Sequence, residues 1–197
     1  MGFQCERCGR CCSDPSLYVM ITHRDILRFE FFLPEIDLFS FIAFYQVPKD
    51  ALSIEKRLMS PRIFTNRGEV FLGLLKKENH CIFFENKKCQ IYECRPQICR
   101  SFPYTFQIRK DQLYWGYSTK AKEYCPALKK ESKINKIELE QLATEILNET
   151  KEFEQLIKIW NHLARMGVIE PTVELLIQFI TGKIKLSVEK LEHVKKK

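Results

Sequence analysis

The sequence predicts an α+β protein: a small cysteine-rich metal-binding part with short strands and helices, followed by a C-terminal helical part. Three observations support this. Short alternating apolar runs, separated by turn residues, occupy the middle of the chain. The last of the nine cysteines is Cys125. After Lys133, apolar residues recur at helical spacing and no strand signal remains. We therefore expect a metal-binding domain over residues 1–130 and a helical extension over residues 131–197.

The composition is that of a globular protein, with 45% hydrophobic and 29% charged residues in a chain of 197. This supplies enough apolar material for a core that needs no disulfides. The first residues lack the apolar region of a signal peptide, and no apolar stretch is long enough to cross a bilayer. We expect a cytoplasmic protein with no membrane partner, whose cysteines are metal ligands or redox groups.

Near the amino terminus, the sequence predicts a loop and then two helices. The first cysteine run should form a tight loop in which Gly9 adopts a positive φ. Thr22 and Asp25 have the spacing of a capping box, and the helix that they begin should end at Pro34. A second helix is expected over residues 35–45, because apolar residues recur there at helical spacing.

The middle of the chain predicts short strands joined by turns. An irregular segment over residues 49–68 precedes a strand over residues 69–75. Two shorter strands, over residues 82–85 and 90–92, should flank the turn Asn86-Lys87-Lys88. A longer hairpin is expected over residues 104–118, with its turn at Lys110-Asp111.

The last third predicts one long helix and a shorter one. Gly167 should end the long helix, and Pro171 suits the first turn of the next. A Lys-rich helix or tail then completes the chain. The apolar stripe of the long helix consists of Leu139, Leu142, Ala143, Ile146, Phe153, Ile157, Trp160 and Ala164.

The spacing of the cysteines points to a thiolate-bound metal. Cys5, Cys8 and Cys11 follow one another at the spacing that binds a [4Fe–4S] cluster in bacterial ferredoxins, where a remote fourth cysteine precedes a proline, as Cys125 does here. Four of the same thiolates would also satisfy zinc. Cys12 adjoins Cys11, and neighbouring side chains of an extended backbone point to opposite sides. The pair therefore reaches one centre through a bend or serves two neighbouring centres.

The segment around residues 81–103 carries more cysteines and two arginines. Arg95 and Arg100 adjoin the thiols and could stabilise the negative charge of a thiolate-bound centre, although ordinary salt bridging is an equally good interpretation. Pro96 and Pro103 are expected to keep this segment out of a helix. Cys94 stands apart from the spaced cysteines, and we interpret it as a small buried hydrophobic residue.

These residues resemble a known family. FQCERCGRCC, CIFFENKKCQIY, RPQICRSFP and the later CP are similar to the CxxCxxCC family of YkgJ-type cysteine-cluster proteins, described as zinc- or iron-chelating and often labelled Fe–S oxidoreductases. The same module resembles part of a flagellin lysine N-methylase, but no SAM-binding glycine loop is found here. The resemblance implies the following metal ligands: Cys5, Cys8, Cys11, Cys12, Cys81, Cys89, Cys99 and Cys125.

Our first hypothesis is an iron–sulfur protein with a [4Fe–4S] cluster, in one metal centre or two, that has a redox or enzyme-support role. It would be an Fe–S oxidoreductase or part of a group-transfer system. The alternative is a zinc-stabilised module that binds nucleic acid or protein, and a third is metal sequestration. The net charge of +7 and the basic residues beside the cysteines favour an anionic or protein partner and leave nucleic acid open. Nothing in the sequence indicates the oligomeric state.

Overall fold

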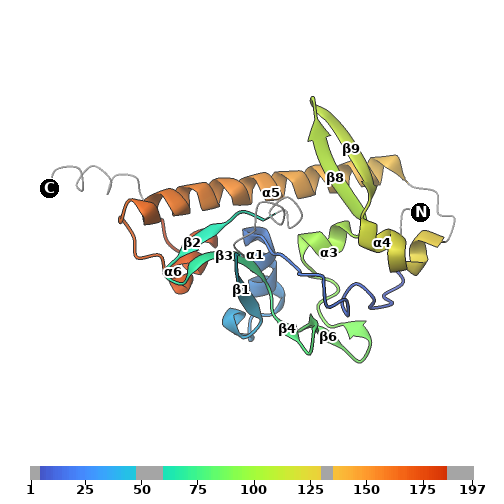
Figure 1. Ribbon diagram of the computed structural model, residues 1–197, viewed down its shortest axis with the longest axis horizontal. Coiled ribbons are helices and arrows are strands. Elements are labelled where there is room, and N and C mark those ends of the chain that lie inside the picture. The colour runs from blue at the N-terminus through green and yellow to red at the C-terminus, as the bar shows by residue number, and fades with distance from the viewer. Residues whose placement is uncertain (1–4, 48–59, 130–134, 186–197) are drawn as a thin grey trace.

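A computed structural model describes residues 5–47, 60–129 and 135–185 of the protein. The 30-residue helix α5 (Lys136–Arg165) runs along most of the molecule, and the small sheets and short helices lie against one side of it (Figure 1). The strands form one three-stranded sheet and three two-stranded sheets. The predicted α+β class is confirmed.

Helix α1 (His23–Phe32) begins with the predicted capping box. The Thr22 hydroxyl accepts a hydrogen bond from the Asp25 N–H, and the Asp25 carboxylate accepts one from the Thr22 N–H at 2.8 Å. Two N–H groups that the first turn leaves unpaired are thereby satisfied. The helix packs through Ile26 and Phe29, which are fully buried.

The helix expected over residues 35–45 is wrong. A short 3-10 helix, η1 (Leu38–Ser40), is followed by strand β1 (Ile42–Gln46). Four consecutive apolar residues from Ile42 to Tyr45 suit a buried strand as well as a helix, so periodicity alone cannot distinguish the two. Antiparallel pairing with strand β3 (Gly68–Leu74) decides in favour of the strand.

The main sheet has the strand order β1-β3-β2, with β2 spanning Ile63–Thr65. The strand expected over residues 69–75 is confirmed as β3, whose inner residues Val70 and Leu72 are fully buried. The segment expected to be irregular contains β2, and residues 49–59 of it lie outside the described residues. Residues of this sheet form part of the main hydrophobic core.

Two small hairpins follow the sheet: β4 (Lys76–Lys77) with β5 (His80–Cys81), and β6 (Phe84–Glu85) with β7 (Lys88–Cys89). The predicted turn is confirmed but shorter, since only Asn86 and Lys87 form it, with φ values of 50° and 60°. Residues 90–92, expected as a strand, form turns instead. The consequence is that Cys89 lies in a strand beside the turn.

The segment from Pro96 to Pro103 contains a helix, contrary to the expectation. Helix α3 spans Gln97–Ser101, and Pro96 occupies its N-cap position. A proline is tolerated there because its missing N–H would have had no partner within the helix. Cys99 and Arg100 therefore lie on a helix rather than in an extended loop.

The hairpin over residues 104–118 is confirmed as β8 (Tyr104–Arg109) and β9 (Gln112–Tyr117), which projects beyond α5 (Figure 1). Helix α4 (Thr119–Tyr124) follows, and its cap is the Ser118 hydroxyl, which accepts from the Ala121 N–H. A short 3-10 helix, η2 (Pro126–Lys129), comes next. Sequence analysis missed both helices because each is a single turn or two.

Helix α5 buries the predicted stripe, and Leu142 alone of its members is only partly buried. Trp160 is fully buried, and its Nε1–H donates to the Phe64 carbonyl of β2 at 2.8 Å. Gly167 ends the helix with φ +67°, as predicted. Helix α6 (Val173–Ile180) begins after its cap Thr172, so Pro171 precedes the cap and does not lie in the first turn as expected. The Lys-rich tail lies outside the described residues from 186 onward.

One hydrophobic cluster combines residues of the sheet, α1, α5 and α6, including Leu72, Phe29, Trp160 and Leu176. The core therefore crosses residue 130, and residues 130–134 themselves are outside the described ranges. The proposed division at that point stays a prediction. Among the described helices, none combines the length and apolar character needed to traverse a bilayer.

The packing of Trp160 provides a test of the core. We expect Trp160→Ala to lower the free energy of unfolding by about 3–5 kcal/mol, because it leaves a cavity and removes the bond to Phe64. The matched control is Ile159→Ala, since Ile159 is 47% exposed on the same helix. Denaturant unfolding followed by circular dichroism measures both. Equal effects would contradict the burial of Trp160.

Candidate metal centre

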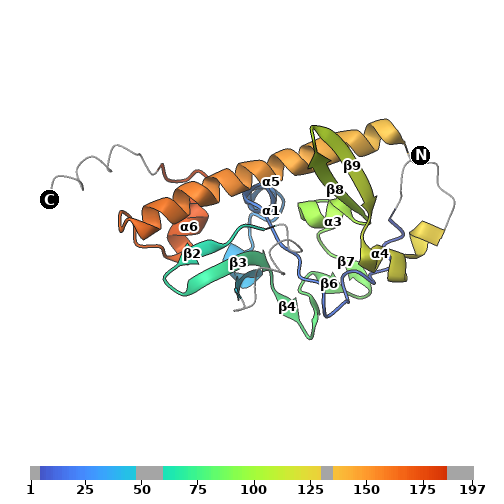
Figure 2. The same cartoon turned by 45° about the horizontal axis from the view of Figure 1, so that its top comes forward.

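The amino-terminal cysteine loop packs on the two small hairpins. The Cys12 carbonyl accepts a hydrogen bond from the Cys81 N–H at 2.9 Å, which joins residues far apart in the sequence. Within the loop, the Cys12 N–H donates to the Gly9 carbonyl at 2.9 Å. Figures 1 and 2 both show this segment beside β6 and α4. The first and second cysteine groups therefore meet in one region.

Gly9 is required at the tightest point of this loop. Its φ is +72°, as the sequence analysis predicted, and it is buried. A Cβ atom at this position would lie 2.3 Å from Cε2 of the Phe84 ring. The aromatic ring of β6 thus lies directly against the backbone of the cysteine loop, and any side chain at residue 9 would separate them.

The other side of the loop contacts α4, which ends at Cys125. The Arg10 Nη1–H donates to the Tyr124 carbonyl at 3.0 Å, and Asp14 pairs with Lys120 of α4 at 3.4 Å. These contacts place the Cys125 thiol near Cys8 and Cys5. Burial raises the pKa of Cys125, and the charges of those two thiolates raise it further.

A second set of thiols gathers around Cys99 and the hairpin cysteines. Burial raises the pKa of Cys99, and charges at Cys11, Cys81 and Cys89 add to that shift. Burial likewise raises the pKa of Cys81 to about 11, with further contributions from Cys89 and Cys11. These thiols are close enough to oppose one another's ionisation.

Cys11 and Cys12 lie between the two sets. Their Sγ atoms are 3.9 Å apart, and this thiol–thiol hydrogen bond lowers the pKa of Cys11 to about 7 while raising that of Cys12. Charges at Cys99 and Cys89 contribute to the rise for Cys12. The charge of Cys11 also affects Tyr124 of α4. Burial raises the pKa of Tyr124, and the charge of Cys11 raises it further.

All nine cysteines are free thiols. Each of the eight candidate ligands takes part in one of the contacts or charge effects described above. Within the described ranges, no three His, Cys, Asp or Glu side chains already surround a common point as metal ligands do. Cys94 is 4% exposed in the main core, which confirms its interpretation as a buried hydrophobic residue. The donors are therefore all sulfur, the ligand type preferred by zinc and by iron–sulfur clusters.

Comparison with known proteins agrees with this chemistry. The CxxCxxCC family, described as a putative zinc- or iron-chelating domain, matches residues 4–152. The chain belongs to the CxxCxxCC family. It is therefore a metal-binding, cysteine-cluster protein, as the predicted resemblance implied. An uncharacterized protein of Methanocaldococcus jannaschii, MJ0661, is 30% identical over 131 residues, which is 65% of this chain and 59% of that relative. No solved structure matches the chain.

The two candidate arginines of this CxxCxxCC chain have different surroundings. Arg95 lies over the Tyr92 ring at 4.0 Å. Burial raises the pKa of Cys89, and the charge of Arg95 opposes that rise. Arg100 instead pairs with two glutamates of α5, Glu145 at 2.7 Å and Glu149 at 3.1 Å. Of the two arginines, only Arg95 is placed to offset thiolate charge directly.

Arg7 is one of the basic residues beside the cysteines that the sequence analysis linked to an anionic partner, but its contact within the site was not predicted. Its guanidinium also lies over the Tyr92 ring, at 3.8 Å, and it pairs with Glu93 at 3.8 Å. Cation–π contacts of this kind contribute roughly 0.5–1 kcal/mol at exposed positions. Tyr92 therefore helps to join the cysteine loop to the second cysteine segment. No spacing rule in the sequence signals this contact.

The contact at Gly9 provides a test of loop docking. We expect Gly9→Ala to displace the loop from Phe84 and to increase the reaction rate of the cysteines with a thiol reagent in metal-free protein. Gly167→Ala is the matched control, because Gly167 has a similar φ of +67° but a methyl group added there would meet no atom within 4 Å. It should lower stability by about 1 kcal/mol and leave thiol reactivity unchanged. Identical reactivity of both variants would contradict the docking.

Proposed function

We propose that this chain is an iron–sulfur protein in which Cys5, Cys8, Cys11 and Cys125 bind a [4Fe–4S] cluster. The observation that supports this most directly is the approach of Cys125 to the amino-terminal loop through the bond between Arg10 and the Tyr124 carbonyl. A remote Cys-Pro supplies the fourth ligand in the ferredoxin arrangement as well. Such a cluster supplies one-electron transfer when it is bound.

The remaining candidates, Cys12, Cys81, Cys89 and Cys99, form a second four-thiolate site in this proposal. The bond between the Cys81 N–H and the Cys12 carbonyl supports this grouping, as does the mutual effect of these thiols on their pKa values. In this proposal the adjacent residues Cys11 and Cys12 serve neighbouring sites, with their Sγ atoms 3.9 Å apart. The two sites would therefore lie side by side.

The surroundings fit a negatively charged centre. Burial of the thiols keeps most of them protonated in the absence of a cation, so metal binding would release protons. The positive charge of Arg95 acts on Cys11 and Cys89, and Arg7 lies over the same Tyr92 ring as Arg95. Positive charge near an iron–sulfur cluster raises its reduction potential, because it stabilises the reduced form.

Zinc is the second candidate, and the Cys11–Cys12 contact favours it. Two thiolates on one tetrahedral zinc lie about 3.8 Å apart, given Zn–S bonds of about 2.3 Å. The Sγ atoms of these residues are 3.9 Å apart. In this alternative both would bind one ion, and the chain would be a zinc-stabilised binding module.

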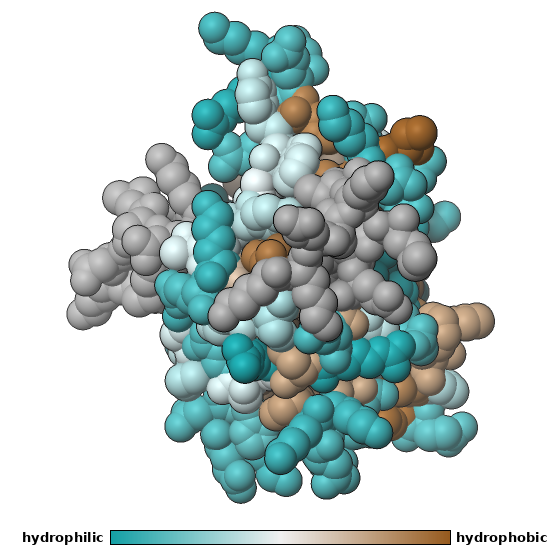
Figure 3. All heavy atoms as spheres, turned by 90° about the vertical axis from the view of Figure 1, so that its right-hand side faces the viewer, coloured by the Kyte–Doolittle hydropathy of each residue, from teal (hydrophilic) through white to brown (hydrophobic). Residues whose placement is uncertain are grey.

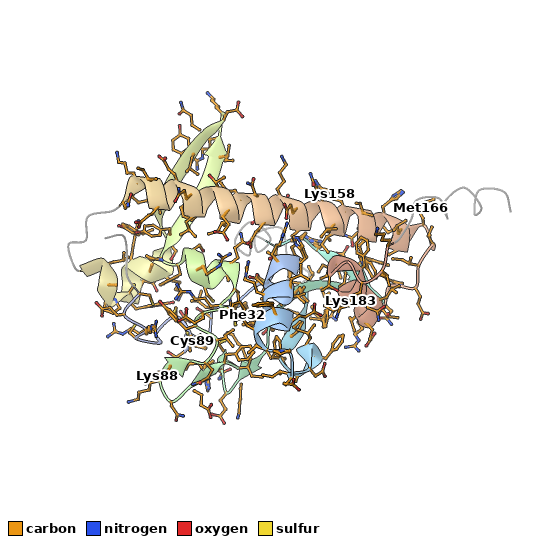
Figure 4. The ribbon with its side chains drawn as sticks, turned by 180° about the vertical axis from the view of Figure 1, so that it is seen from behind. Phe32, Lys88, Cys89, Lys158, Met166 and Lys183 are labelled. Atoms are coloured by element: carbon orange, nitrogen blue, oxygen red, sulfur yellow. The ribbon has the colours of Figure 1, made fainter. Side chains whose placement is uncertain are left out.

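A partner with an anionic surface fits the edge of the first site. Cys8 is exposed there, and the exposed side chains of Arg10, Lys87 and Lys88 lie on the loop and on the neighbouring hairpin. Figure 4 shows Lys88 and Cys89 on this hairpin, on the far side of the molecule from Lys158 of α5. The proposed roles are electron transfer to a redox enzyme or support of a group-transfer system in the cytoplasm.

The end of the molecule that bears α4 is largely hydrophilic in its described part, with apolar residues in small groups (Figure 3). Such a surface suits a transient, electrostatically guided complex better than a permanent apolar interface. We therefore favour an acidic protein surface as the partner in this proposal.

Metal analysis of protein purified without air tests the proposal. We expect brown protein that contains iron and acid-labile sulfide and has a charge-transfer absorption band. Colourless protein with stoichiometric zinc would overturn the iron–sulfur assignment in favour of the second candidate. Protein that contains neither metal would overturn both. Cys94→Ala is the control and should retain the metal content of the unsubstituted protein, because Cys94 lies in the core.

The grouping of ligands has a separate test. We expect Cys8→Ser and Cys81→Ser each to remove about half of the bound metal, since each would disable one four-thiolate site. The double variant should bind none. Equal and complete loss in both single variants would show that all the thiols serve one centre. The metal-to-protein ratio, measured by elemental analysis, provides the answer.

A further inference from the structure

A buried glutamate interrupts the apolar stripe of α5. Glu149 is 8% exposed and lies between Ile146 and Phe153, at a position where the helical repeat calls for an apolar residue. A carboxylate without partners is expensive to bury, so its presence there needs an explanation. Residues that break a local folding rule often do so for function.

Two guanidinium groups meet at this glutamate. Arg28 of α1 donates from Nη1 to the Glu149 Oε1 at 2.9 Å, and Arg100 of α3 donates from Nη2 to the same oxygen at 3.1 Å. Arg100 also pairs with Glu145, one turn earlier on α5, at 2.7 Å. Three helices are therefore joined at a single carboxylate oxygen.

A second connection joins α1 to α3 through Asp25. Its carboxylate is fully buried and accepts a hydrogen bond from the Gln97 N–H at the start of α3, at 2.8 Å. Asp25 also pairs with Arg28. The Gln97 side chain in turn donates to the Thr150 Oγ1 of α5 at 3.0 Å. Asp25 and Glu149 are thus both bonded to residues of the same short helix, α3.

Helix α3 has only five residues and depends on these contacts for its position. An isolated helix of this length is unstable in water. It lies between α5 and the cysteine hairpins in both ribbon views, and it carries Cys99 next to Arg100 (Figures 1 and 2). Whatever orients α3 also orients the Cys99 sulfur.

We propose that Glu149 is a positioning residue for the second metal site: through Arg100, and through Arg28 and Asp25, it holds α3 so that Cys99 faces Cys12, Cys81 and Cys89. This inference rests on the two-site function proposed above. Because α5 supplies the glutamate, binding of metal at this site and docking of α5 stabilise each other. The first site, which contains no residue of α3, is independent of this network.

The test compares metal release from the two sites. In the Cys8→Ser background, which retains the second site, we expect Glu149→Gln to accelerate metal loss to a chelator about 10-fold, the lower end of the range for residues that orient ligands. In the Cys81→Ser background, which retains the first site, the same substitution should change nothing. Glu154→Gln is the matched control, since Glu154 is exposed on the same helix.

A purely structural role would accelerate release from both sites alike, and that result would overturn the inference. Unchanged release in both backgrounds would overturn it as well. Protein without metal before any substitution would instead contradict the proposed function itself. If Glu149→Gln does not fold, Arg100→Met keeps the apolar stem and removes only the link to α5. It should show the same selective effect on the second site, and a uniform effect would again contradict the role.

Discussion

Repulsion among neighbouring thiolates is the constraint on which the cysteine end of this molecule depends. Sulfurs from three distant segments lie close together, and burial together with their own charges raises the pKa of most of them. Cations that neutralise such a group favour its full ionisation, which couples metal binding to proton release. The loop around Gly9, the turn before Cys89 and the end of α4 all serve to bring these sulfurs together.

The rest of the fold can be understood as a support for that region. The main sheet and α1 form a core with α5 and α6, and the candidate ligands Cys81 and Cys89 pack against this core. Short elements that could not fold alone, such as α3 and the two small hairpins, carry Cys81, Cys89 and Cys99. Hydrogen bonds and ion pairs from α1 and α5 hold α3 against the core. The core thereby holds in place candidate ligands that lie on segments too short to fold alone.

Division of the thiols into two sets would explain the adjacent pair Cys11-Cys12. A loop with cysteines spaced by two residues can surround one centre, and an additional neighbouring thiol can reach a second. The basic residues at the exposed edge and the cation–π contacts at Tyr92 supply charge of the opposite sign. In the proposed function, the same features would attract an anionic partner surface to this edge.

The sequence by itself determined the family, the capped helix α1, the main strand β3, the long hairpin and the stripe of α5. These features depend on local spacing and periodicity, which can be read directly from the order of residues. Only the tertiary structure decided that residues 42–46 form a strand and that α3 is a helix, because pairing with β3 and bonds to Asp25 and Glu149 come from distant segments. It also decided which cysteines are neighbours and that Arg100 faces α5, since approach across the fold leaves no local pattern in the sequence.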